Sequence, residues 1–420
     1  MPPSPEPPPR LLDPPPSARA RRPSRPLFGL FFALSSFAEG GQAVVLLWLT
    51  YELAGSAFLI GVMVVLGYLP AAVLGLLLRK SADRGRAGLI ARGTNSVLSL
   101  VSVLLAVQQL TSGGSAALSI TVIAVSQVVL SVAKMFNKAA LNRLVRGAFE
   151  REVAKRLLAA SQSASLAGQV CGAGLAGVVL AQGWITQGLL CAALAYAASA
   201  GALALGTRGY EDRARPRPRP EPCPGGPGGD GEPEPVPLRW TPALVGVLVF
   251  SVPGSGALQF LNTVLVPLAG TVAPGRPSYY ALLNIVTIAG GFLAGVLLST
   301  GGVSSRRVLG RALPVTAVLA LALALVDTAA VVAVVAFGLS LAVTCHVICM
   351  QVLTNQVPDD HEVGQFAVVR NVVASLTKAA FSFGAGALAG AFGVGVAFLV
   401  LACCTALFAV VWLVRRPEWA

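Results

Sequence analysis

Apolar residues gather into about twelve runs of membrane-spanning length, and polar stretches separate the runs. A helix needs about 20 mostly apolar residues to cross the hydrocarbon core of a bilayer. The runs lie near residues 27–50, 56–78, 89–111, 116–136, 157–181, 183–206, 241–268, 278–300, 308–326, 328–353, 366–390 and 392–414. The pattern therefore predicts an all-α membrane protein with about twelve transmembrane helices.

A polar segment rich in Pro, Gly and Arg at 207–239 divides these spans six and six. We therefore expect an N-terminal six-helix lobe at 27–206 and a C-terminal six-helix lobe at 240–414, joined by a flexible cytoplasmic linker. Residues 1–26 are rich in Pro and Arg, which predicts a disordered cytoplasmic tail, and 415–420 form a short second tail.

Composition agrees with a membrane protein and argues against other classes. The chain is 55% hydrophobic and only 12% charged, against roughly 25% charged residues in an ordinary soluble domain. No Lys follows a Gly, so the sequence has no P-loop and ATP-driven transport by this chain is excluded. The "HEVGQ" at His361 lacks the second His of a zinc protease. We therefore expect a protein that is not an enzyme.

The net charge of +13 raises the question of a nucleic-acid partner, and the positions of the basic residues answer it. With the N-terminus inside, nearly all of the 31 Lys and Arg residues fall in cytoplasmic segments. Arg276 is the exception in an outer loop, and Lys378 lies within a span. Such a bias places both termini in the cytoplasm, so the charge reports topology and no nucleic-acid partner is expected.

An internal repeat relates the two halves. "NRLVRGAFEREVAKRLLAASQSASLAGQVCGAGLAG" and "TNQVPDDHEVGQFAVVRNVVASLTKAAFSFGAGALAG" share the plan of span end, polar loop and Gly/Ala-rich span, at an offset of about 212 residues. Parallel halves of this kind occur in secondary transporters, where the site lies between the halves near the midplane of the membrane. We therefore predict pseudo-symmetric lobes with a site between them.

Several motifs resemble the major facilitator superfamily, and more narrowly its bacterial drug and siderophore exporters, over roughly residues 27–414. They are "LWLTYELAGSAFLIG", "SADRGRAGLI", "FNKAALNRLV" and "NQVPDDHEVGQFA". The resemblance implies proton-coupled export of a small amphipathic metabolite, drug or siderophore by alternating access. It also implies a monomer in the bacterial inner membrane, with the lipid bilayer and a small-molecule substrate as partners. The proton gradient would drive transport without a cofactor.

Two family signatures have partial matches. Asp83, Arg84 and Arg86 resemble the loop between spans two and three, which implies a cytoplasmic gate, although Arg79 stands where that signature opens with Gly. A glycine series in span five resembles an antiporter signature, with Ala173 and Ala176 replacing its usual Pro and one Gly. The series comprises Gly168, Gly172, Gly174 and Gly177. The alternative for these glycines is close helix packing.

Ionisable groups deep in a span are costly and mark functional candidates. Glu39 lies near the midplane of span one, and we interpret it as the proton-coupling acid; the alternative is a lone acid with hydrogen-bond partners. Lys378 lies about as deep in span eleven, where it could neutralise Glu39, meet an anionic substrate, or form a structural ion pair. Asn371 falls roughly on the same helix face as Lys378.

Lys134 in span four and His346 in span ten are related by the repeat offset. Lys134 could act as an electrostatic partner of Glu39, or its long side chain could reach the interface. His346 could shuttle a proton or be a structural side chain. Cys345, Cys349 and Met350 beside His346 resemble a soft-metal site, but such residues usually only pack in an apolar helix, and we expect no metal.

Two other functions stay open. An importer of the same fold could take up a nutrient, a metal complex or a lysolipid. A membrane receptor or assembly factor could keep the fold without transporting anything. Charged groups within the spans, such as Glu39 and Lys378, favour transport over the second alternative.

Overall fold

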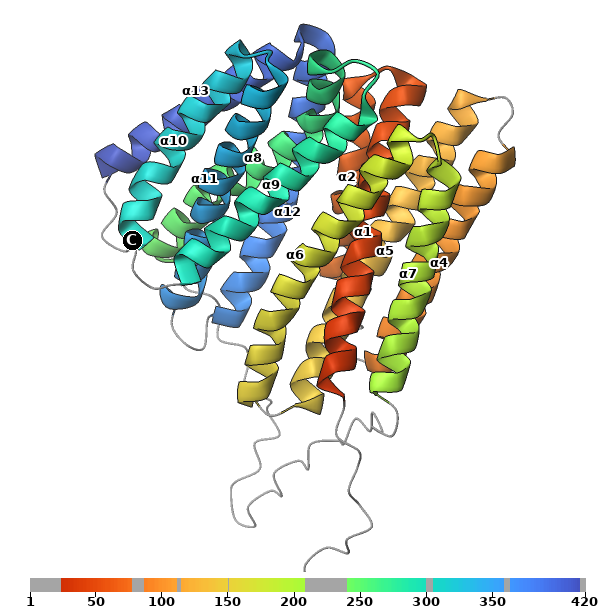
Figure 1. Cartoon of the computed structure of the whole chain (residues 1–420). Helices are drawn as coiled ribbons and strands as arrows, with labels where there is room; N and C mark the ends of the chain where they lie inside the picture. Colours follow the sequence, from red (N-terminus) through yellow and green to blue (C-terminus); the bar gives the residue numbers. More distant parts are fainter. Residues whose placement is uncertain are drawn as a thin grey trace, which may run out of the picture.

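The computed structural model describes residues 24–77, 87–111, 115–149, 151–207, 240–299, 305–358 and 363–415. Along these residues the chain forms helices and no strands (Figure 1). Nearly all of the expected tails and of the linker lies outside the described residues, as do Asp83, Arg84 and Arg86. The first helix begins at Arg25, within the stretch 1–26 that was expected to be disordered, so the last two residues of that stretch are helical.

Six helices form the N-terminal lobe: α1 (Arg25–Ala54), α2 (Ala57–Leu77), α4 (Ala87–Thr111), α5 (Ala116–Ala148), α6 (Arg151–Ala181) and α7 (Ile185–Gly206). Six more form the C-terminal lobe: α8 (Pro242–Val272), α9 (Pro277–Ser299), α10 (Ser305–Leu325), α11 (Ala329–Gln356), α12 (Val363–Phe392) and α13 (Val394–Arg415). Eleven of these helices in the described chain are long and apolar enough to cross a membrane, and α6 carries a shorter apolar stretch at Ala167–Ala181. The prediction of an all-α membrane protein is confirmed.

Local sequence signals set several helix ends. The Ser115 hydroxyl accepts a hydrogen bond from the Leu118 amide and caps α5. Gly55 ends α1 with φ 60°, and its amide bonds to the Tyr51 carbonyl, so the chain reverses directly into α2. A left-handed residue at this point favours glycine, because a Cβ would crowd the following carbonyl oxygen.

The two lobes meet through α2 with α12 and through α6 with α9. Two contacts between the lobes lie toward the ends of the helices that are far from Arg25. Trp48 of α1 stacks on Tyr280 of α9, with ring centroids 6.0 Å apart. Gly61 of α2 faces Gly386 of α12 without any side chain between the two backbones.

At the opposite end, which carries Arg25, the ribbons of the two lobes diverge (Figure 1). The charge pattern predicts cytoplasmic termini, and in that orientation the contacts described above would lie on the outer side of the membrane.

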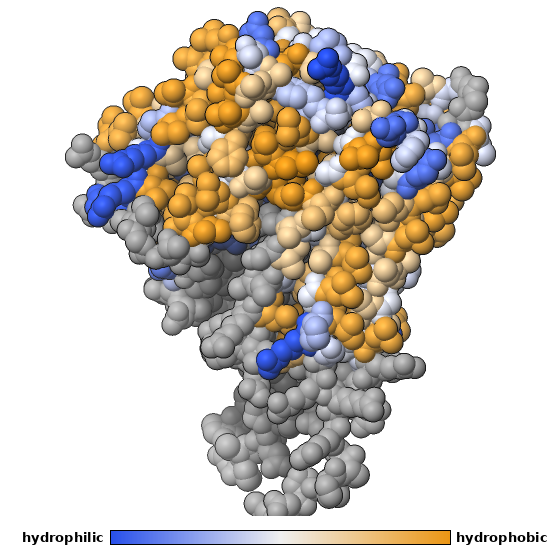
Figure 2. Space-filling model, in the orientation of Figure 1, coloured by the Kyte–Doolittle hydropathy of each residue, from blue (hydrophilic) through white to orange (hydrophobic). Residues whose placement is uncertain are grey.

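Apolar side chains cover the flank of the bundle, and hydrophilic side chains gather toward its ends (Figure 2). Large hydrophobic residues are exposed along many helices, among them Leu194, Val318 and Leu407. A soluble monomer rarely exposes apolar patches on this scale. The flank is therefore the surface that the hydrocarbon core of a bilayer covers.

Candidate transport site

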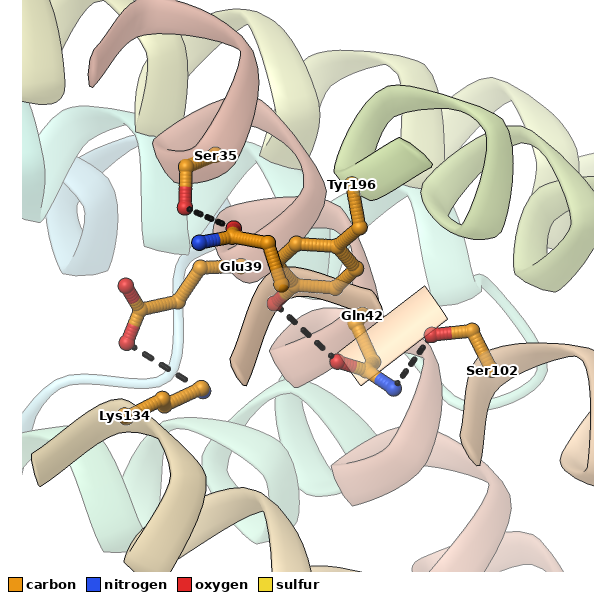
Figure 3. Close-up of polar contacts among 7 residues, drawn as sticks. Ser35, Glu39, Gln42, Ser102, Lys134 and Tyr196 are labelled. Carbon is orange, nitrogen blue, oxygen red and sulfur yellow. Dashed lines mark hydrogen bonds and ion pairs between the residues drawn. The ribbon is translucent and has the colours of Figure 1, made fainter. Parts of the chain in front are cut away.

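An ion pair joins two helices in the middle of the N-terminal lobe. Lys134 Nζ of α5 lies 3.2 Å from Glu39 Oε1 of α1, which is midway along its helix (Figure 3). The side chains are 33% and 44% exposed, so the protein covers the pair only in part. The structure thus brings together two of the residues that the sequence singled out.

Helix α1 contacts α2, α5, α6 and α7 of its own lobe and α8 and α9 of the other. The Glu39 carboxylate reaches Lys134 of α5, so the ion pair lies on the side of α1 that meets α5.

A group of buried hydrogen bonds lies about one turn beyond Glu39 along α1. The Gln42 amide donates to the Ser102 hydroxyl of α4 at 3.1 Å, and the Tyr196 hydroxyl of α7 donates to Gln42 Oε1 at 3.3 Å (Figure 3). Gln42 is 2% exposed and Tyr196 is fully buried. These bonds fix α1 against α4 and α7, and so hold the helix that presents Glu39.

Asn95 of α4 is the centre of a second buried group. Its carbonyl oxygen accepts from the hydroxyls of Ser35 at 3.2 Å and Ser199 at 3.0 Å, and its amide donates to Asn137 Oδ1 at 3.0 Å. Four helices therefore meet at one fully buried side chain. The members of this network do not stand out in the sequence because they are uncharged. Ser35, Glu39 and Gln42 do share the spacing of one helix face, which was the available signal.

Lys378 occupies a place across the boundary between the lobes. Its Nζ lies 5.4 Å from the centre of the Tyr68 ring, so a helix of the C-terminal lobe, α12, places a cation over an aromatic residue of α2. The ion pair that the structure shows for Glu39 is with Lys134, whereas Lys378 lies against Tyr68.

Two more polar residues lie on α12 toward the cytoplasm. Asn371 is exposed, and seven positions separate it from Lys378, which puts both on one helix face. Arg370 is buried and donates to the Ser251 hydroxyl of α8 at 3.5 Å. A ligand between the lobes could therefore meet Asn371, whereas Arg370 serves to join α12 to α8.

His346 lies in different surroundings from Lys134, although the repeat relates the two. It is 1% exposed, and its ring packs against Gly254 of α8, where a Cβ would meet Nδ1. Neither ring nitrogen has a hydrogen-bond partner. The described residues contain no group of three or more side chains that could hold a metal ion, so Cys345 and Cys349 beside it form no such site. In this state His346 is a packed, dry side chain.

The glycines of α6 serve two interfaces. A Cβ at Gly168 would meet the Ala33 carbonyl oxygen of α1, and one at Gly172 would meet that of Phe37. Gly174 and Gly177 turn to the other lobe, where a Cβ would meet Ile285 and Ala281 of α9 respectively. Close packing is thus what these four positions do in this state, on α1 through one face and on α9 through the other.

Comparisons with known proteins agree with this architecture. A bacterial homologue of the human lysosomal transporter Spinster, inward-facing and occupied, is 12% identical over 93% of this chain and 96% of its own, with a TM-score of 0.68. A D-xylose–proton symporter is 14% identical over 92% and 95%, with a TM-score of 0.63. The nucleoside transporter NupG is 11% identical over 94% and 99%, with a TM-score of 0.65.

Likeness at this level of identity shows the fold alone, and no curated protein sequence matches the chain. The family model described as Major Facilitator Superfamily matches residues 28–382, which spans both lobes. Its match and the transporter folds point to a transporter rather than an enzyme. The chain therefore belongs to the Major Facilitator Superfamily.

Proposed function

We propose that this protein is a proton-coupled secondary transporter of a small amphipathic molecule, working by alternating access, with Glu39 as the group that binds the transported proton. The single observation that carries the proposal is the Glu39–Lys134 pair, 3.2 Å apart and only partly covered by the protein, with side chains 44% and 33% exposed. A carboxylate in the middle of a span is costly and is the kind of group that proton-driven carriers use.

The chemistry of the pair explains how a proton could change the structure. An ionised Glu39 attracts Lys134 and so holds α1 against α5. A protonated Glu39 loses that attraction, and Lys134 is then available to another partner. The proton would reach Glu39 from whichever side the lobes leave open, since the side chain is 44% exposed.

Export is the direction that the resemblance to drug and siderophore exporters suggests, and we propose it as the first candidate. The proposal includes a monomer in the cell membrane of a bacterium, with both termini in the cytoplasm and the proton gradient as the only energy source. Uptake of a proton would accompany release of a substrate such as a metabolite, drug or siderophore.

Proton movement in everted vesicles tests this proposal. The lumen is acidified first, and amphipathic compounds are then added outside while a pH-sensitive dye is followed. We expect a compound to dissipate the gradient with the wild type and not with Glu39→Gln. Glu52→Gln is the matched control, because Glu52 lies on the same helix but exposed at its outer end. Equal dissipation with Glu39→Gln and the wild type would remove Glu39 from proton coupling.

Import by symport is a second candidate, and the geometry of the ion pair favours it for one kind of substrate. If the substrate is an anion, protonation of Glu39 frees Lys134 to bind it, so proton and substrate bind together. Right-side-out vesicles distinguish the two candidates, because adding the substrate of a symporter outside draws protons in. If none of the compounds causes proton movement in either vesicle orientation although the protein is correctly inserted, that result would favour a receptor or assembly factor.

A further inference from the structure

We propose that an anionic phospholipid binds at one end of the C-terminal lobe, with its phosphate against arginines of α10 and α13 and its acyl chains along the apolar sides of the same two helices. The inference concerns a different lobe from the Glu39–Lys134 pair and does not depend on the proposed function. The arginine cluster that forms the site comprises Arg306, Arg307 and Arg311 near the start of α10 and Arg415 at the end of α13.

The packing of α10 against α13 brings the two parts of the cluster together. A Cβ added at Gly310 of α10 would lie 3.9 Å from Trp412 Nε1 of α13, so these two positions face each other. Each span reverses the direction of the one before it, so α10 and α13 run antiparallel. Arg306 lies four residues before Gly310, and Arg415 lies three residues after Trp412. Both arginines are therefore about one turn beyond the contact, at the same end of the lobe.

On α10 the arginines continue the side of the helix that faces lipid. Arg307, Arg311, Val315 and Val318 are all exposed, and they follow one another at intervals of four, four and three residues. Such intervals place side chains on one face of a helix. The two valines belong to the apolar flank of the bundle, so the two arginines lie where that flank reaches the membrane surface.

The same arrangement recurs on α13. Leu407, Val411 and Arg415 are exposed at intervals of four residues, which again is one face of a helix. Leu413 and Val414 beside Arg415 are exposed as well, at 50% and 77%. Apolar sides of two packed helices thus lead to arginines at the same end. A phospholipid has this shape, with acyl chains on one side of a phosphate.

The acidic side chains that the structure describes leave this cluster unbalanced. Glu39 pairs with Lys134, Glu52 lies at the outer end of α1, and Asp327 follows the far end of α10. Like charges gathered at one helix end repel one another, and a bound anion offsets that repulsion. Guanidinium groups suit a phosphate in particular, because one guanidinium can donate two parallel hydrogen bonds to it.

The surroundings of the cluster favour a lipid over a soluble anion. Trp412 lies beside it and packs on Phe250 with ring centroids 4.8 Å apart, and Trp is a residue that marks the interface between membrane and water. Figure 2 shows hydrophilic side chains at the left edge of the molecule, where the start of α10 and the end of α13 lie in Figure 1, beside apolar ones. Basic clusters at this level of the membrane bind anionic head groups.

Native mass spectrometry of the full chain in detergent tests the inference with two lipids that share their acyl chains. The probes are dioleoylphosphatidylglycerol, which is anionic, and dioleoylphosphatidylcholine, which is zwitterionic. We expect the first molecule of the anionic lipid to bind about tenfold or more tightly than the zwitterionic one. Higher salt should weaken binding of the anionic lipid to the wild type, a result that needs no variant.

Three variants locate the site. Arg311→Gln and Arg415→Gln should each weaken binding of the anionic lipid about fivefold, since that is the contribution of one basic residue at an anionic surface. Arg25→Gln is the matched control, because it removes one exposed arginine from the start of α1 in the other lobe and should leave binding unchanged. Unchanged binding of the zwitterionic lipid shows that each variant is intact.

Three results would overturn the inference. The first is equal affinity of the wild type for the two lipids. The second is an effect of Arg25→Gln as large as those of Arg311→Gln and Arg415→Gln, which would mean that only the total charge matters. The third is displacement of the anionic lipid by inorganic phosphate at millimolar concentration, which would make the cluster a site for a soluble anion.

Discussion

The contact between Gly61 and Gly386 joins the two lobes at the helix ends far from Arg25, the predicted outer side, and offers a direct test of how the lobes separate in alternating access. A Cβ added at Gly386 would lie 2.8 Å from the Ala57 carbonyl oxygen, 2.9 Å from Gly61 Cα and 3.0 Å from Gly61 N. All three are backbone atoms of α2, so no side chain can turn away to make room. Gly386→Ala should therefore force α2 and α12 apart.

The size of the effect follows from the cost of overpacking, which is about 1–3 kcal/mol for an added methyl group that the surroundings cannot absorb. The clash lies between the lobes and not within either one. An outward-facing state, in which α2 and α12 separate at this end, relieves it without unfolding. The ratio of outward- to inward-facing molecules should therefore rise about 5- to 150-fold.

Distances between spin labels on the outer side measure this ratio. In a cysteine-free background, labels at Gln182 and Thr328 report one exposed turn from each lobe. We expect Gly386→Ala to add a population with a longer distance than the wild type shows. Gly384→Ala is the matched control, because a Cβ there meets nothing within 4 Å on the same helix. An unchanged distribution for Gly386→Ala, or an equal shift for Gly384→Ala, would refute the reasoning.

Two further predictions concern stability, measured by unfolding in mixed detergent micelles. A double-mutant cycle with Glu39→Gln and Lys134→Gln should give a coupling free energy of no more than about 1 kcal/mol. The reason is that the side chains are 33% and 44% exposed, and a partly exposed ion pair contributes little. A value above about 3 kcal/mol would mean that the pair is desolvated. Asn95→Ala should lower the free energy of unfolding by about 2–3 kcal/mol, since it leaves several buried polar groups without partners. Ser96→Ala, on the exposed face of the same helix, should change it by less than about 0.5 kcal/mol, and equal losses would contradict the role of the network.

The hydrophobic pattern predicted the fold well because lipid imposes a simple rule on every span. Each expected span corresponds to a helix, but several helices are longer than their apolar runs. Helix α5 continues to Ala148 and α6 begins at Arg151, whereas the expected spans ended at 136 and began at 157. Outside the hydrocarbon core a helix can continue through polar residues, since water satisfies their side chains. Hydropathy therefore locates the membrane, and not the end of the helix.

The site was predicted less completely, because depth in the membrane does not specify which way a side chain faces. Glu39 and Lys134 stood out by their charge, yet the sequence could not rank Lys134 against Lys378 as the partner of Glu39. The packing of α1 against α5 decides in favour of Lys134. His346 shares the repeat position of Lys134 but packs against Gly254, because the two lobes diverge in the residues of the neighbouring helix. A repeat thus predicts equivalent positions without equivalent surroundings.

Helix α6 connects these observations, because glycines on its two faces pack against α1 and α9, the two helices that move in the proposed mechanism. Gly168 and Gly172 let α1 approach so closely that their Cβ atoms would meet its backbone, and α1 carries Glu39. Gly177 lets α9 approach on the other face, where Ala281 follows the Tyr280 ring that stacks on Trp48 at the closed outer end. Backbone contacts of this kind transmit displacement, since no flexible side chain lies between them to absorb it. A shift of α1 after Glu39 binds a proton would therefore reach the outer contact through α6 as well as through α1 itself.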